Sequence, residues 1–271
     1  MYSRIRLMLS CLAILLHFMC AQRSDAQGRI DEATWGEAGQ NSPEVSTAEL
    51  RTILREHTAT VIDARPFKEY ALGHIPGAMN AAPKPGVPMS LYISDVDEVG
   101  RLTQQNNDAP IVLYCDGPFC AKAKQLAVGL IAEGYSNVKR YQLGMSVWRA
   151  LGGPVQIELA GAALIMARDP GALFVDARDH QEFARKTLPG AKNLPRNTLM
   201  TDKDSTRMEA GKNSGHLPVD DYNTRVIVFG DDEAQASAVA EALARESFSN
   251  VAYFAGSLEE LLVASEADKH K

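Results

Sequence analysis

The sequence predicts an α/β protein of two similar domains, each a small parallel sheet flanked by helices. The first observation is the length of 271 residues, which suits about two domains. The second is a long segment that occurs twice at a constant offset. The third is the alternation of short apolar strands with amphipathic helices inside each copy. With 45% hydrophobic and 23% charged residues, each half has enough apolar side chains for its own core.

The internal repeat aligns residues 61–80 with residues 174–193 without a gap, 113 positions later. The unit is too long for a solenoid and therefore indicates a duplicated domain. The break between the copies falls at Gly152, Gly153 and Pro154. The residues that are identical in both copies include Asp63, Ala64, Arg65, Glu69, Pro76, Gly77, Ala78, Asn80, Asn137 and Val138.

The elements of the first copy follow in order along the chain. Periodicity predicts a helix over 47–55, a strand over 61–63, a buried strand over 111–114, a helix over 121–132 and a strand from 137 to 141. Pro76 and Gly77 predict a turn. Apolar strands between helices are typical of a parallel sheet covered on both faces. Such sheets bind ligands at the carboxyl ends of their strands, where Cys115 falls.

The first 26 residues are predicted to be a signal peptide. Arg4 and Arg6 precede an apolar run over 7–19 that contains no acidic residue and is short for a bilayer span. Small residues favour cleavage after Ala26, with Ala21 as an alternative, and a retained membrane anchor is the competing interpretation. The predicted location is periplasmic or secreted. The remaining divisions are a linker over 27–44, domains over 45–153 and 154–265, and a tail over 266–271.

Removal of residues 1–26 takes away three arginines and one aspartate, which changes the net charge from −6 to −8. An acidic chain lacks the clustered cations that neutralise phosphates. We therefore expect no nucleic-acid partner and no membrane partner after cleavage. The sequence also predicts no cofactor.

The mature chain keeps two cysteines, Cys115 and Cys120, which in an oxidising compartment form either a reactive pair or one small bridge. Both alternatives stay open from the sequence. A zinc site is not expected, because a second pair of ligands is missing. No histidine lies in a nucleophile motif, and His74 is expected to brace its turn.

Cys115 stands where a buried strand ends, before a Gly-Pro loop and the first turn of a helix. Free amides there favour a thiolate and can hold an anion. Lys122 and Lys124 add positive charge, whereas Asp116 acts in the opposite direction. The competing interpretation is a buried, inert cysteine, but the strand-to-helix turn favours a functional one.

The segments DARPFKEYALGHIPGAMN, IVLYC with its loop and helix, and YQLGMSVWRALGGPV together resemble the rhodanese family. The resemblance covers nearly all of residues 45–155 and recurs more weakly over 157–263. It implies two rhodanese-like domains and a sulfurtransferase in which Cys115 takes a sulfane sulfur from thiosulfate or mercaptopyruvate. The resulting persulfide passes its sulfur to a thiol or cyanide. The resemblance also implies that Arg65 supports the fold near the loop. The implied anion cradle is the backbone of Asp116, Gly117, Pro118, Phe119 and Cys120, together with Lys122.

Three features depart from the family pattern. Cys120 and Ala121 stand where thiosulfate-type loops have Arg followed by Ser or Thr, so the sulfur donor stays open, and phosphatase chemistry is set aside. In the second domain Gly230 aligns with Cys115, so that domain is expected to be catalytically silent. The acids at 231–233 are interpreted as helix N-terminal residues rather than as a repulsive device. Finally, tandem family members usually carry the cysteine in the C-terminal domain.

Three functions therefore compete: a sulfurtransferase, a thiol redox protein that cycles the Cys115/Cys120 pair, and a non-catalytic binding module. Cys120 is either a resolving thiol that attacks the Cys115 persulfide or a small apolar residue of the first helical turn.

Overall fold

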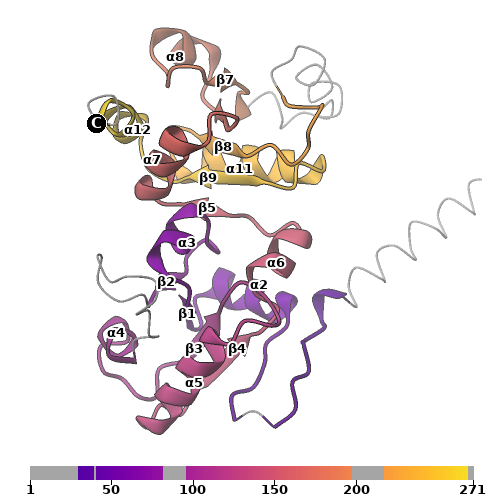
Figure 1. Ribbon diagram of the computed structural model, residues 1–271, viewed down its shortest axis with the longest axis vertical. Helices are drawn as coiled ribbons and strands as arrows, with labels where there is room; N and C mark the ends of the chain where they lie inside the picture. The colour runs from indigo at the N-terminus through magenta and orange to yellow at the C-terminus, as the bar shows by residue number, and fades with distance from the viewer. Residues whose placement is uncertain (1–29, 40, 82–95, 197–216, 268–271) are drawn as a thin grey trace, which may run out of the picture.

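A computed structural model of the protein describes residues 30–39, 41–81, 96–196 and 217–267. The predicted signal peptide lies outside these residues. Figure 1 shows two α/β domains, one drawn in indigo to magenta and the other in orange to yellow. Each contains a parallel sheet with helices on its faces, which confirms the predicted fold class. In the described residues no helix is both long and apolar enough to cross a bilayer.

The first domain has a four-stranded parallel sheet in the order β2-β1-β3-β4. Its strands are β1 (Thr60–Asp63), β2 (Met79–Asn80), β3 (Ile111–Tyr114) and β4 (Val138–Tyr141). Its helices are α2 (Thr47–Glu56), α3 (Phe67–Leu72), α4 (Val96–Leu102), α5 (Lys122–Ala132) and α6 (Gly144–Ala150).

The second domain has a five-stranded parallel sheet in the order β5-β9-β8-β6-β7. Its strands are β5 (Gln156–Ile157), β6 (Leu173–Asp176), β7 (Lys192–Asn193), β8 (Val226–Phe229) and β9 (Val251–Phe254). Its helices are α7 (Leu159–Arg168), α8 (His180–Arg185), α11 (Glu233–Arg245) and α12 (Leu258–Ala267).

The cores follow the alternation of side chains along the strands. In β3, Val112 and Tyr114 face a cluster that also includes Trp148, whereas Ile111 and Leu113 face the cluster beneath α5. The first of these clusters continues into the second domain through residues of β8, α7 and α12. The two domains therefore share one apolar core between their sheets, and each sheet has a second core on its outer face.

The residues that recur in the sequence repeat form the same buried bracket in both domains. In the first, Arg65 pairs with Asp63 at 2.6 Å and donates to the carbonyl of Gly73 at 2.7 Å. The side-chain amide of Asn80 donates to the backbone carbonyls of Asp63 and Arg65. The second domain repeats this bracket with Asp176, Arg178, Lys186 and Asn193. The bracket fixes the carboxyl end of β1 or β6, beside the loop that follows the next strand of the sheet.

Two observations concern the ends of the domains. Residues 27–44 are predicted to be a linker, but within the described part Glu44 makes a parallel bridge to Arg140 at the edge of β4. The amide of Arg140 donates to the carbonyl of Pro43, and the amide of Val45 donates to the carbonyl of Arg140. Exposed backbone at a sheet edge is readily paired in this way. At the other end α12 continues through Ala267, so the predicted tail from 266 begins inside a helix.

Candidate functional site

The loop that follows β3 is fixed on the side that carries Cys115. The amide of Met145 donates to the carbonyl of Cys115 at 2.9 Å, and the amide of Ser146 donates to the carbonyl of Asp116 at 2.8 Å. The residue before them, Gly144, has φ +64°, and a Cβ there would lie 2.5 Å from the carbonyl oxygen of Cys115. Only glycine permits this close approach of two backbones. The start of α6 therefore holds the cysteine in place.

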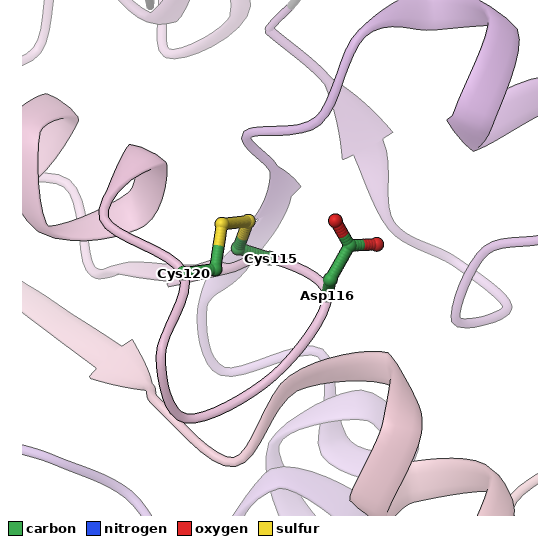
Figure 2. Close-up of side chains that lie close together, drawn as sticks. All are labelled: Cys115, Asp116 and Cys120. Atoms are coloured by element: carbon green, nitrogen blue, oxygen red, sulfur yellow. A yellow bond between two sulfur atoms is a disulfide. The ribbon is translucent and has the colours of Figure 1, made fainter.

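Cys115 and Cys120 are joined by a disulfide, with their Cα atoms 6.2 Å apart. Figure 2 shows the S–S bond closing the loop, with the side chain of Asp116 on the limb that leaves Cys115. The sequence leaves two alternatives for this pair, and the structure has the bridge. In this form neither sulfur is a thiolate, so the loop must be reduced before either can act as a nucleophile. Cys115 is 3% exposed, whereas Phe119 at the tip of the loop is 88% exposed.

Not every residue of the predicted anion cradle has an amide that is available to an anion. Pro118 has no N–H group, and the amide of Cys120 donates to the carbonyl of Gly117 at 3.0 Å. The amides of Asp116, Gly117 and Phe119 have no acceptor among the described residues. The first turn of α5 contains no acidic residue, so the positive N-terminal end of the helix dipole is not neutralised by its own side chains and also favours an anion near the loop. Three of the five loop residues therefore keep an amide that is not bonded within the described residues.

The charged groups around the loop are paired. Arg65 reaches Asp116 at 3.4 Å as well as Asp63. Burial acts to lower the pKa of Arg65, but the hydrogen bond and charge of Asp63 raise it above its ordinary value. Lys122 lies 3.9 Å from Glu69. Burial, with a smaller contribution from Asp116, raises the pKa of Glu69. Arg65 thus joins the bracket to the loop.

The three side chains of Cys115, Asp116 and Cys120 lie within 4.8 Å of one another at their possible ligand atoms. Zinc binds thiolates, and both sulfurs here belong to a disulfide. In its bridged form this cluster therefore offers no thiolate ligand to a metal ion.

In the second domain the loop that follows β8 has no cysteine and is contacted by the side chain of Gln235. Gly230 follows β8 as Cys115 follows β3, and a Cβ at this position would lie 2.5 Å from the side-chain oxygen of Gln235. That oxygen accepts from the amide of Asp231 at 2.8 Å. Asp232 caps α11 by accepting from the amide of Gln235 at 2.7 Å. The acid at 232 therefore has the helix-capping role that its position in the sequence indicates.

Two residues that contact the first loop, Gln142 and Trp35, are not among those that the sequence analysis singled out. Gln142 donates to the carbonyls of Pro118 and Cys120, and the ring of Trp35 lies 5.1 Å from that of Phe119. A polar residue directly after a predicted strand was the available signal for Gln142. Nothing local in the sequence connects Trp35 with a loop more than 80 residues away.

These features define a class of protein: a tandem α/β protein with a cysteine loop at the carboxyl end of a central strand in one domain. The equivalent loop of the other domain has a glycine in place of that cysteine. The rhodanese-like domain family matches residues 46–151 and again residues 160–264. The chain belongs to the rhodanese-like domain family, with two such domains.

Curated relatives match one domain's length of this chain. The thiosulfate sulfurtransferase GlpE of Pseudomonas paraeruginosa is 31% identical over 99 residues, which are 36% of this chain and 76% of that protein. An HTH-type transcriptional regulator of Mycobacterium tuberculosis is 36% identical over 116 residues, 42% of this chain. The chain spans only 46% of that regulator's length.

Solved structures are similar at lower identity. A thiosulfate sulfurtransferase from Pseudomonas aeruginosa is 21% identical, with 80% of this chain and 41% of that chain covered and a TM-score of 0.33. The 3-mercaptopyruvate sulfotransferase SseA from Escherichia coli is 20% identical, with 78% and 96% covered and a TM-score of 0.32.

Proposed function

We propose that the protein is a sulfurtransferase that moves a sulfane sulfur through a persulfide on Cys115. The observation that carries the proposal is the position of Cys115 inside a rhodanese-like domain, at the carboxyl end of β3. It begins a loop in which three amides have no acceptor within the described part of the chain. Amides and a helix N-terminus stabilise both a thiolate and an anionic donor. The relatives that are sulfurtransferases support this class of reaction.

In the first step the Cys115 thiolate attacks the outer sulfur of a donor anion such as thiosulfate. A bond forms between Cys115 and that sulfur, and sulfite leaves with the electron pair of the broken S–S bond. With mercaptopyruvate the C–S bond breaks instead, and its electron pair leaves with the carbon fragment as the enolate of pyruvate, which takes up a proton. A thiol or cyanide acceptor then takes the outer sulfur and releases the Cys115 thiolate.

Cys120 offers an internal second step. Its thiolate attacks the Cys115 sulfur, and the outer sulfur leaves as hydrosulfide. The sulfane sulfur gains two electrons, and the two cysteines lose them as they form the bridge that the structure contains. Two equivalents of an external thiol then reduce the bridge and return the protein to its dithiol form.

The test uses the reduced mature protein and intact-mass measurement after exposure to thiosulfate, mercaptopyruvate or polysulfide. Wild type and Cys120→Ser are expected to gain one sulfur, and Cys115→Ser is expected to gain none. A resolving Cys120 also predicts a longer-lived persulfide and slower sulfide release in Cys120→Ser. Failure of every donor to load wild type and Cys120→Ser would refute the sulfurtransferase proposal and leave dithiol–disulfide exchange or a binding module.

A second candidate, dithiol–disulfide exchange with another protein, is favoured by the bridge itself. It requires no sulfur donor. Reduction of a substrate disulfide by the reduced protein alone, lost in either cysteine variant, supports this candidate over sulfur transfer.

The proposal includes export to the periplasm or the exterior. The sequence of residues 1–26 supports it, and a disulfide persists in oxidising compartments. Recovery of a chain that begins at Gln27 from the exported fraction is the expected result, and an uncleaved chain in the cytosol would contradict it.

A further inference from the structure

Gln142 grips the limb of the loop that carries Cys120. It lies between β4 and α6 and is 5% exposed. Its side-chain amide donates to the carbonyl of Pro118 at 2.8 Å and to that of Cys120 at 3.3 Å. The other limb is held through the carbonyls of Cys115 and Asp116. Both limbs of the loop are thus anchored to the segment that joins β4 to α6.

Arg140 sets the orientation of Gln142. Its guanidinium donates to the side-chain oxygen of Gln142, which leaves the NH₂ group of Gln142 to face the loop carbonyls. The Arg140 side chain is fully buried, and a buried cation requires acceptors and counter-charges. It donates to the hydroxyl of Ser42 at 2.7 Å and pairs with Glu37 at 3.3 Å and Glu44 at 3.7 Å.

Those three partners belong to the segment that precedes the first family match at residue 46. We call residues 35–39 and 41–44 the N-terminal strap. Its Glu37 also pairs with Lys124 in the first turn of α5 at 2.6 Å, and the hydrogen bond from Lys124 lowers the pKa of Glu37. Its Trp35 lies edge-on to Phe119 at the loop tip. The strap therefore meets the loop directly and also through Arg140 and Gln142.

The silent domain provides an internal comparison. At the repeat offset, Tyr253 stands where the first domain has Arg140, and Ala255 stands where it has Gln142. The domain without a cysteine thus also lacks this pair. The arginine–glutamine pair is thus present in the domain that has the two cysteines and absent from the equivalent positions of the other domain.

We infer that Gln142, oriented by Arg140 and the N-terminal strap, is a positioning residue that holds Cys120 next to Cys115 in the reduced protein. Two groups fixed in contact react with a far higher effective concentration than two groups on a free loop. The grip therefore favours closure of the bridge and shortens the life of a Cys115 persulfide. The persulfide part rests on the proposed function, whereas the effect on the bridge does not.

The test is the reduction potential of the Cys115–Cys120 pair in the full chain, measured by thiol alkylation in defined glutathione or dithiothreitol buffers. Gln142→Met keeps the side chain's length and removes its hydrogen bonds. We expect about a tenfold loss in the equilibrium for closure, a rise in potential of about 30 mV. Glu37→Gln, which weakens the pairing with both Lys124 and Arg140, is expected to shift the potential in the same direction by less.

The matched control is Gln235→Met, which removes the α11 glutamine that accepts from the loop of the second domain. It is expected to leave the potential unchanged. Unfolding free energies of all variants are measured in parallel. An unchanged potential in Gln142→Met, even with reduced stability, overturns the inference. If Gln142→Met does not fold, an unchanged potential in Glu37→Gln overturns it.

Persulfide lifetime after loading separates the two proposals. A longer lifetime in Gln142→Met together with the shifted potential supports both. A shifted potential in a protein that no donor loads supports the positioning role and refutes sulfur transfer.

Discussion

Gly144 determines how closely α6 approaches the cysteine loop. Its Cβ would meet three backbone atoms of the loop within 2.8 Å, at a φ of +64° that side chains rarely adopt. Neither the loop backbone nor the start of α6 can yield without breaking the hydrogen bonds from Met145 and Ser146. A substitution here therefore affects the geometry of the site as well as stability.

We expect Gly144→Ala to lower the free energy of unfolding by about 2–4 kcal/mol, combining left-handed strain with overpacking. Gly152→Ala is the matched control, since Gly152 has φ +72° and nothing within 4 Å of its Cβ position. It is expected to lose only about 1–2 kcal/mol from backbone strain. Urea unfolding of both variants measures the difference. Equal losses would show that the contact with the loop contributes nothing.

His74 is a buried neutral histidine where the two domains meet. It is 1% exposed, and its Nδ1 donates to the carbonyl of Tyr70 at 3.0 Å. Its ring stacks on that of Tyr70. Glu158 lies 3.6 Å from Nε2 and favours the charged ring, but that carboxylate is 38% exposed and weakened by water. Burial therefore dominates and lowers the pKa of His74 to about 4.

This pKa makes stability depend on pH in a defined direction. Between pH 6.5 and about 4 the unfolded chain binds a proton at His74 that the folded chain does not. The free energy of unfolding therefore rises with pH through this window and falls by about 3 kcal/mol as the solution is acidified across it. Urea unfolding at pH 7 and pH 4.5 is expected to show a smaller loss in His74→Gln than in wild type. The exposed His180→Gln should keep the wild-type loss. An equal loss in all three proteins would assign the effect to other groups.

At the scale of elements, apolar periodicity was sufficient for the central strands and the main helices of the first domain. The strand predicted over 111–114 is β3, and the helix predicted over 121–132 is α5, which begins at Lys122. Short elements such as β2 and α3 carry too few residues for a period and were not predicted. The N-terminal strap escaped prediction because its contacts, such as Glu37 with Arg140, span about 100 residues of sequence.

The candidate site was predictable only in part for the same reason. A cysteine after a buried strand is visible in the sequence, and so is its absence at Gly230. The bridge depends on the separation of two Cα atoms, which the sequence does not fix. The grip of Gln142 depends on how the segment after β4 lies against a loop about 20 residues earlier.

The packing of α3 on α7 requires a glycine at position 161. A Cβ on Gly161 would lie 1.9 Å from the carbonyl oxygen of Ala71, so α7 approaches the backbone of α3 without a side chain between them. Because α3 also carries Glu69, which pairs with Lys122 beside the cysteine loop, this contact connects the second domain to the site.

We expect Gly161→Ala to destabilise the protein by about 2–3 kcal/mol through overpacking. Alanine is otherwise favoured over glycine in a helix by about 1 kcal/mol, so a loss can only come from the close approach. Gly171→Ala is the control, because its nearest neighbour would be Asp169 at an ordinary 3.7 Å. Thermal or urea unfolding compares them, and a stabilised Gly161→Ala would contradict the packing described here.

At the scale of the whole molecule, the second domain completes the core of the first. The cluster between the sheets joins Tyr114 and Trp148 of the first domain to Ile165 and Phe229 of the second. His74 and Gln156 also exchange two backbone hydrogen bonds across the boundary, at 2.9 and 3.0 Å. The second domain has Gly230 where the first has Cys115, and it still contributes its share of the common core.

A fragment of residues 27–155 is therefore expected to be less stable than the mature chain by about 3 kcal/mol or more. Uncovering even two large apolar side chains costs about that much. Urea unfolding measures the loss. Addition of a separate fragment of residues 156–271 is expected to raise the urea midpoint of the first fragment part of the way back to that of the mature chain. The same second fragment with Gly161→Ala should restore less, because it cannot bring α7 against α3. A first fragment that unfolds at the full-length midpoint, and loads sulfur as well as the mature chain does, would show that the second domain is dispensable.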